Sequence, residues 1–213
     1  MSAPERVFAG TTSVLLRRGE GWAWIGLDSA DGLHRLTLAT LEALDRLLAD
    51  LRFQGLRRMA LSGAPWMEGR PCHFSAGADL HEVLALDGAS ADPFARRGQR
   101  VMDHLVWTGW RTLTVLSGAA MGGGCDLALH GQERWAVEGL RLKHPAARHG
   151  ILTGFGGTVR LPGVLGEAGA SRLFRDLETW DEGQALEAGA AHRVLEAGAV
   201  RGEVEAWLGL SAG

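Results

Sequence analysis

Three consecutive glycines, Gly122-Gly123-Gly124, form the part of the sequence best suited to chemistry at the main chain. Because glycine has no Cβ, a ligand can approach the backbone N–H groups closely, and a helix that starts after the turn adds the positive end of its dipole. Such a turn can bind an anion, either a phosphate or an oxyanion that develops during a reaction. No Gly-Lys-Ser/Thr follows it, and neither it nor the later turn at 154–157 matches the dinucleotide pattern. Close packing of a helix on a strand is the alternative use of the three glycines.

Few other side chains are placed for covalent or metal chemistry. The sequence has no tyrosine, so no mechanism can use a tyrosine acid, and its one lysine, Lys143, is the only place for a Schiff base. Cys72 and Cys125 form neither a C-x-x-C pair nor a zinc spacing, which predicts two separate reduced thiols. The histidines show no ligand spacing, and no metal site is predicted.

Length and charge limit the class of protein. A chain of 213 residues, 46% hydrophobic and 22% charged, is long enough for one globular domain with a sizeable core. The net charge of −3 and the lack of basic runs give no support to nucleic-acid binding. No apolar stretch is long enough to span a bilayer, and the first residues lack the apolar region of a signal peptide. We therefore expect one cytoplasmic domain over 1–213, with no nucleic-acid or membrane partner.

Short apolar runs and amphipathic segments alternate along the chain. Apolar or β-branched runs predict strands at 22–27, 58–61, 112–116 and 135–137. Apolar spacing and capping residues predict helices around 41–51, from Asp92-Pro93 onward, and at 125–129, the second half of 161–174, 181–188 and 204–208. This order implies an α/β fold with crossover connections. We interpret Trp22, Trp24, Trp107 and Trp110 as core or interface packing.

Four stretches in one order carry a resemblance to a known family. They are the apolar run at 24–27 with 36–38, the His73-to-Leu80 loop (HFSAGADL), the 117–129 segment (SGAAMGGGCDLAL) and the glycine turn with its flank at 150–162. Together they resemble the crotonase family, also called the enoyl-CoA hydratase/isomerase family. The resemblance covers about residues 14 to 196.

The resemblance implies a fold, a substrate and an assembly. The fold is a ββα superhelix in which helices wrap two roughly perpendicular sheets. The substrate is a coenzyme A thioester, no cofactor is bound covalently, and the assembly is a homotrimer or hexamer. The N–H groups of Ala78 and Gly123 are expected to hold the thioester carbonyl as it becomes an enolate. Ala76, Ala78 and Leu80 are expected to meet the CoA adenine, with Gly122 beside Gly123 at the substrate.

The acid/base residues depart from the family pattern. Hydratases of the family use two glutamates, and this sequence has Asp126 at one position and Ala146 at the other. Asp126 is a candidate general base, or else a first-turn carboxylate that favours the helix dipole. His144 and His149 flank Ala146 and could replace the lost acid/base, or else are packed or surface histidines.

The reaction stays open at this point. Isomerisation, hydration and decarboxylation each need the oxyanion site, and decarboxylation depends least on a carboxylate pair. The alternative is a catalytically inactive CoA-binding or assembly subunit, since one glutamate is replaced and the family's C-terminal helices are largely absent after about residue 196. A relative that has abandoned CoA is a third hypothesis, against which the retained Ser75-to-Leu80 loop argues. The acyl group is set by pocket shape, which sequence does not give.

Overall fold

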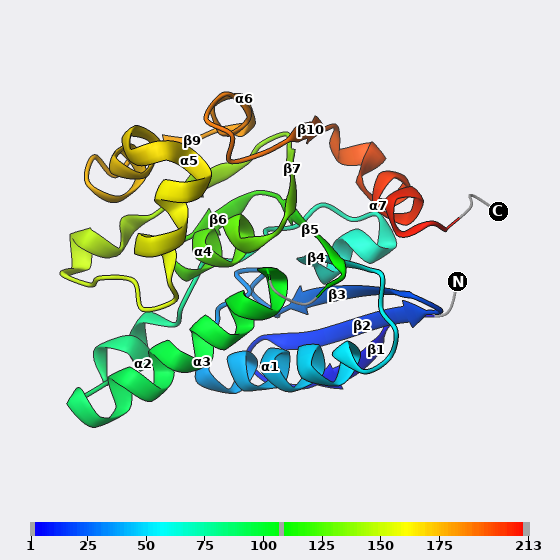
Figure 1. The fold of residues 1–213 in the computed structure, drawn as a ribbon, viewed down its shortest axis with the longest axis horizontal. Coiled ribbons are helices and arrows are strands. Elements are labelled where there is room, and N and C mark those ends of the chain that lie inside the picture. The colour runs from blue at the N-terminus through cyan, green and yellow to red at the C-terminus, as the bar shows by residue number, and fades with distance from the viewer. Residues whose placement is uncertain (1–2, 107–108, 211–213) are drawn as a thin grey trace.

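The structure is a computed structural model and describes residues 3–106 and 109–210. In the described part, seven strands form the larger sheet in the order β1-β2-β3-β4-β5-β7-β10 (Figure 1). Its first three strands are an antiparallel meander and its last four are parallel. The bounds are β1 Glu5–Phe8, β2 Ser13–Gly19, β3 Trp22–Asp28, β4 Arg58–Gly63, β5 Arg111–Leu116, β7 Glu133–Val137 and β10 Arg193–Leu195.

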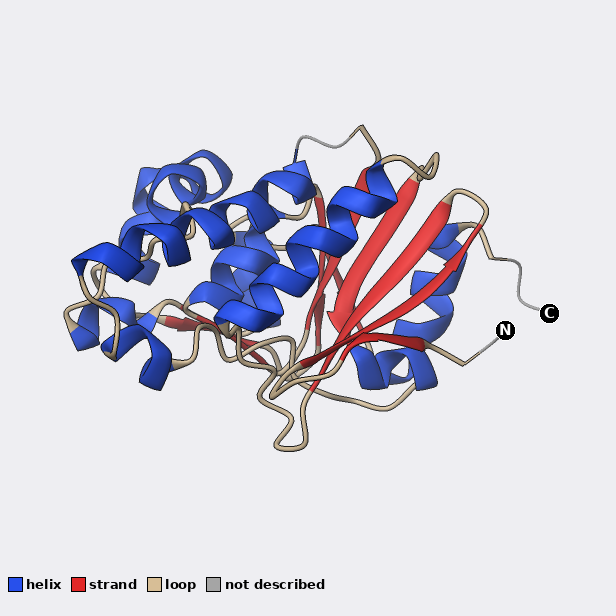
Figure 2. Cartoon of the chain, turned by 90° about the horizontal axis from the view of Figure 1, so that it is seen from below, coloured by secondary structure: helices blue, strands red, loops and turns tan. Residues whose placement is uncertain are grey.

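A smaller sheet of short strands lies beside the first. It joins β6 (Ala119–Met121), β8 (Arg141–Lys143) and β9 (Thr179–Trp180). Figure 2 shows these strands crossing the direction of the long ones. This architecture confirms the predicted α/β fold of two sheets wrapped by helices.

Helices cover both faces of the larger sheet (Figures 1 and 2). α1 and α3 pack on each other against one face, and α7 packs on the other. The α-helices are α1 Leu38–Arg52, α2 Leu80–Leu84, α3 Gly88–Val106, α4 Gly123–His130, α5 Gly157–Phe174, α6 Glu182–Glu187 and α7 Val200–Leu208. The 3₁₀ helices are η1 Ala64–Glu68, η2 Pro145–His149 and η3 Ala197–Ala199.

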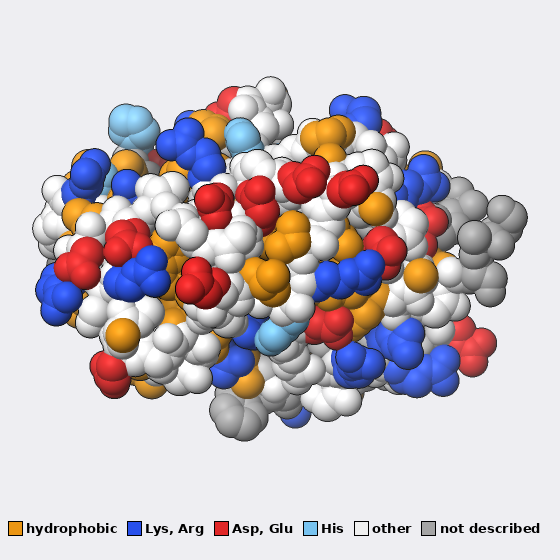
Figure 3. Space-filling view, turned by 90° about the horizontal axis from the view of Figure 1, so that it is seen from above, with side chains coloured by type: hydrophobic (Ala, Val, Ile, Leu, Met, Phe, Trp, Pro, Cys, Tyr) orange, Lys and Arg blue, Asp and Glu red, His pale blue; other side chains and the backbone are white. Residues whose placement is uncertain are grey.

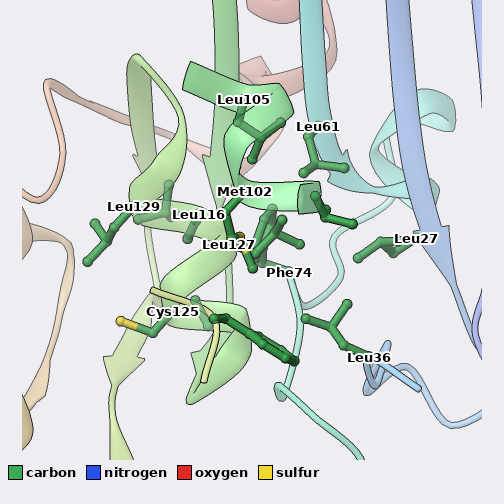
Figure 4. Packing of buried hydrophobic residues seen from close by; sticks show 14 of the residues in the cluster. Leu27, Leu36, Leu61, Phe74, Met102, Leu105, Leu116, Cys125, Leu127 and Leu129 are labelled. Atoms are coloured by element: carbon green, nitrogen blue, oxygen red, sulfur yellow. The ribbon is translucent and has the colours of Figure 1, made fainter. Parts of the chain in front are cut away.

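The strands bury side chains on alternate faces, as a sheet covered on both sides requires. Along β3, Ile25 and Leu27 join the core under α1 and α3, whereas Trp24 joins the core under α7. Figure 4 shows the first of these cores, where Leu27, Leu61 and Leu116 of the sheet meet Met102 and Leu105 of α3. Trp24 and Trp110 are buried, as predicted; Trp22 is partly buried, and Trp107 lies outside the described residues.

Several predicted helix starts are wrong: α5 begins at Gly157 rather than in the second half of 161–174, α7 at Val200 rather than at 204, and α3 before Asp92-Pro93. α3 begins at Gly88, four residues before Asp92-Pro93, because Asp87 caps it by accepting hydrogen bonds from the Ala89 and Ser90 amides. Pro93 therefore lies inside the helix, and Asp92 makes an exposed ion pair with Arg96 instead.

A partly buried ionic cluster joins α1 to α3. The Asp45 carboxylate on α1 accepts hydrogen bonds from Arg97 and Arg100 and contacts His104, all on α3. Burial alone would raise the pKa of Asp45, but these hydrogen bonds outweigh it and hold that pKa below its usual value. The carboxylate is therefore ionised, and it ties the two helices together.

The surface carries charges of both signs. Figure 3 shows acidic and basic side chains interspersed over the face that it displays. Within residues 3–106 and 109–210, no helix is both long and apolar enough to cross a membrane.

Candidate functional site

The loop before α2 packs tightly against the turn before α4. Ser75 and Ala120 form a parallel bridge, and the Met121 amide donates to the Ser75 carbonyl. Gly77 has a φ of +96°, and a Cβ there would lie 2.3 Å from the Met121 carbonyl oxygen. Only glycine fits this left-handed, crowded position, so the two segments meet main chain to main chain.

This contact brings the two predicted amide donors together. A Cβ placed on Gly123 would lie 3.3 Å from the Ala78 nitrogen, and one on Gly77 would lie 3.0 Å from the Gly123 nitrogen. Gly123 is the first residue of α4, so its N–H has no partner within the helix. Among the described residues, neither the Ala78 nor the Gly123 amide donates to a protein acceptor. Two free donors therefore stand side by side at the positive end of α4.

Both donors line a cavity of about 410 Å³. Ala76, Leu80 and Gly122 line it too, so the structure brings together every residue predicted to bind the substrate. Most of the remaining wall is apolar, from α2, α3 and the segment before α5: Val83, Leu86, Ala91, Phe94, Ala95, Ile151, Leu152 and Phe155. A small acceptor such as a thioester oxygen would meet the donors beside a mostly apolar wall.

His144 is a polar group in this wall. It precedes η2, its side chain is 1% exposed, and its ring packs against Phe174 with centroids 4.5 Å apart. Its Nδ1 atom is buried with no hydrogen-bond partner. Ala146 lines the cavity nearby, where the family's second glutamate would stand by the resemblance.

Asp126 lies behind the cavity wall. Its side chain is fully buried and is not part of the cavity lining, although the sequence predicts that it meets the substrate. Two residues that do line the cavity, His144 and Thr153, contact its carboxylate. Oδ1 is 3.3 Å from His144 Nε2, close enough for an ion pair but out of line for a hydrogen bond. Oδ2 accepts a hydrogen bond from the Thr153 hydroxyl.

The remaining candidates are placed differently. His149 lines the cavity but is an exposed residue at the end of η2. Thr153 was not singled out from the sequence, because no local pattern marks a threonine whose partner is Asp126. In the described part of the chain, no group of three or more His, Cys, Asp or Glu side chains could hold a metal ion.

Comparisons with known proteins agree with this architecture. A probable enoyl-CoA hydratase from Bacillus subtilis strain 168 is 37% identical over 136 residues, which are 63% of this chain and 50% of that protein. The chain thus spans about half the length of that relative. A short-chain-enoyl-CoA hydratase from Clostridium acetobutylicum is 26% identical over 185 residues, 86% of this chain and 69% of that protein.

Solved structures match over nearly the whole chain. Pseudomonas aeruginosa DspI superposes with a TM-score of 0.84 at 27% identity, over 95% of this chain and 74% of that one. An enoyl-CoA hydratase from Bacillus anthracis gives 0.82 at 25% identity, over 94% and 76%. The family model described as enoyl-CoA hydratase/isomerase matches residues 52–208, which is more than half of the sequence. The chain belongs to the enoyl-CoA hydratase/isomerase family.

Proposed function

We propose that this protein binds an acyl-CoA thioester and stabilises the enolate that forms when the α-carbon loses a proton or a carboxyl group, or when water adds to the β-carbon of an enoyl group. The observation that carries the proposal is the pair of unpartnered amides at Ala78 and Gly123, adjacent to each other in one cavity wall. An enolate oxygen accepts from both, and removing one such donor typically costs about 2.7–4 kcal/mol of transition-state stabilisation.

The rest of the cavity suits the same substrate. Its apolar wall favours an acyl chain, and the main chain at Ala76 and Leu80 is proposed to meet the coenzyme A moiety. Ala146 offers no carboxylate, so the two-glutamate hydration mechanism is not supported in this cavity. Isomerisation, decarboxylation or hydration by another base is proposed, with a homotrimer or hexamer as the assembly. The second candidate is a CoA-binding subunit without turnover, which the missing glutamate favours.

Removing one main-chain donor tests the proposal. Ala78→Pro deletes the N–H, whereas Ala78→Gly keeps it and serves as the matched control. The probe is acetoacetyl-CoA, whose enolate is seen by its ultraviolet absorbance on titration with protein. We expect the parent and Ala78→Gly to raise the enolate fraction, and Ala78→Pro to lose at least about 100-fold in enolate affinity.

Two results would contradict the proposal. An enolate affinity of Ala78→Pro equal to that of the control would show that this amide does not hold the oxygen. If the parent protein does not bind acetoacetyl-CoA at all, the cavity is not a thioester-binding site. Thioester binding with no turnover of enoyl- or malonyl-type substrates would favour the inactive subunit.

A further inference from the structure

We infer that His144 Nδ1 takes the α-proton of the bound thioester, and that Asp126 and Thr153 are positioning residues that hold the imidazole for this step. The inference rests on the proposed function, because it needs a thioester held by Ala78 and Gly123.

His144 and Asp126 differ in their position relative to the cavity. A general base must come within hydrogen-bond reach of the proton that it removes. His144 lines the same cavity as the two amide donors, whereas Asp126 does not line it and is fully buried. Of the two groups, the histidine alone borders the cavity, although its side chain is only 1% exposed, and the carboxylate lies behind it.

The contact with Asp126 selects one form of the neutral imidazole. A carboxylate only accepts hydrogen bonds, so Nε2, 3.3 Å from Oδ1, is the nitrogen that carries the hydrogen. Nδ1 is then left with a free lone pair; neither ring nitrogen makes a hydrogen bond within the protein, but only Nε2 has a carboxylate oxygen beside it. The Nε2–Oδ1 contact is not aligned as a hydrogen bond here, and such contacts commonly tighten only when substrate binds.

The carboxylate is fixed from two sides, by Thr153 and Gly157, and the Asp126 main chain is held by His130. Thr153 donates its hydroxyl hydrogen to Oδ2, and the Asp126 carbonyl lies 2.6 Å from His130 Nδ1. Gly157 faces Oδ1 without a side chain, since a Cβ there would lie 1.9 Å from that atom. A buried carboxylate held in this way orients the imidazole and stabilises the imidazolium that forms. His149 has no carboxylate partner among the described residues and lacks this support.

The step balances without any further reactant. The Cα–H bond breaks, the proton goes to Nδ1, and the electron pair forms the enolate, whose oxygen is held by the Ala78 and Gly123 amides. Asp126 faces the imidazolium through Nε2. Returning a proton to carbon regenerates the thioester, and in D₂O the returning particle is a deuteron. Exchange of the α-hydrogen therefore reports this step alone, whichever overall reaction follows.

The experiment measures α-deuterium incorporation into butyryl-CoA in D₂O by mass spectrometry, together with the butyryl-CoA Kd of every variant. We expect His144→Gln to lower the exchange rate at least about 100-fold. We expect Asp126→Asn to lower it by about 10² to 10⁴-fold, because an amide NH₂ turned toward Nε2 places the hydrogen on Nδ1. His81→Gln, an exposed change on α2 outside the cavity, should leave the rate unchanged.

Thr153 gives a finer test of positioning. Thr153→Val removes the hydroxyl from Oδ2 at equal size and should slow exchange about tenfold, while Thr153→Ser keeps the hydroxyl and should restore most of the rate. Kd should change less than about threefold in all variants, since a positioning role alters the rate and not the binding of thioester. Chemical rescue is a second test of His144. In His144→Ala, the rate of α-hydrogen exchange should rise with the concentration of added imidazole.

The possible outcomes separate the two ideas. If the parent binds butyryl-CoA and exchanges its α-hydrogen, but His144→Gln exchanges equally fast, the inference fails and the proposed function stands. If only Asp126→Asn or His149→Gln loses exchange, another base is identified and the inference is equally overturned. If the parent neither binds nor exchanges butyryl-CoA, the proposed function itself is wrong and the inference falls with it.

Discussion

Gly157 at the start of α5 is a sensitive position, because it leaves room for a buried carboxylate. A Cβ on Gly157 would lie 1.9 Å from Asp126 Oδ1, 2.8 Å from its Cγ and 3.2 Å from Thr153 Cγ2. Contacts below 3.0 Å are essentially never made by real Cβ atoms. Gly157→Ala must therefore push the carboxylate aside by roughly 1 Å in a tightly packed region.

The expected magnitude follows from two opposing effects. Overpacking a buried site typically costs about 1–3 kcal/mol. Replacing a helical glycine by alanine returns about 0.5–1 kcal/mol, and less at the first residue of a helix. We therefore expect Gly157→Ala to lower the free energy of unfolding by about 1–2 kcal/mol. Because the carboxylate then leaves His144 Nε2, we also expect α-hydrogen exchange to slow at least about tenfold.

Gly163 on the same helix is the matched control. It is exposed, and a Cβ there would meet no atom within 4 Å, so Gly163→Ala should raise stability by about 0.5–1 kcal/mol. Equilibrium unfolding in urea measures the stability of both variants. Their midpoint urea concentrations are compared, provided that the dependence of the unfolding free energy on urea (the m value) is the same. A Gly157→Ala protein as stable as Gly163→Ala, with an unchanged exchange rate, would refute the placement of Asp126 against α5.

Two further predictions concern groups outside the cavity. Because the folded pKa of Asp45 is held below its unfolded value near 3.9, its contribution to stability is present above about pH 4 and is lost as the pH falls through the folded pKa. Asp45→Asn should therefore be less stable by about 1–2 kcal/mol at pH 7 and should lose less stability on acidification, as urea unfolding at pH 7 and pH 3 would measure. Burial raises the pKa of the Cys72 thiol to about 12 and that of Cys125 well above its usual value, so little thiolate is present near pH 8. Iodoacetamide should label the native protein slowly and the urea-unfolded protein fast, and rapid native labelling would contradict the burial of these thiols.

Side-chain periodicity predicted the elements that carry their own pattern. The leucines at 41, 44, 48 and 51 all face the core from α1, and the central strands of the larger sheet lie where apolar runs predicted them. The hairpin β1–β2 at the sheet edge was not predicted, because its glutamate and arginines interrupt the apolar pattern. The strands β6, β8 and β9 have two or three residues each, which is too few to show a period. Such strands are recognised by their pairing partners in the structure and not by a pattern of their own.

The site divides in the same way. Ala78 and Gly123 could be proposed as main-chain donors from the family resemblance, and Gly77, Gly123 and Gly124 are positions where backbone approaches backbone. The placement of Asp126 behind the cavity wall could not be predicted, because it depends on how α4 is turned relative to the 144–153 segment. Thr153 was missed for the same reason, since its role comes from a partner 27 residues away.

The tight glycine contact between the loop before α2 and the turn before α4 affects how the site tolerates mutation during evolution. A codon change replaces a side chain, but it leaves the peptide N–H in place unless it introduces proline. The proposed carbonyl-holding half of the site is thus shielded from most point mutations, whereas the imidazole and the buried carboxylate behind it are each one substitution from loss. If the proposed function holds, descendants of this protein would keep thioester binding longer than they keep any one reaction of the enolate.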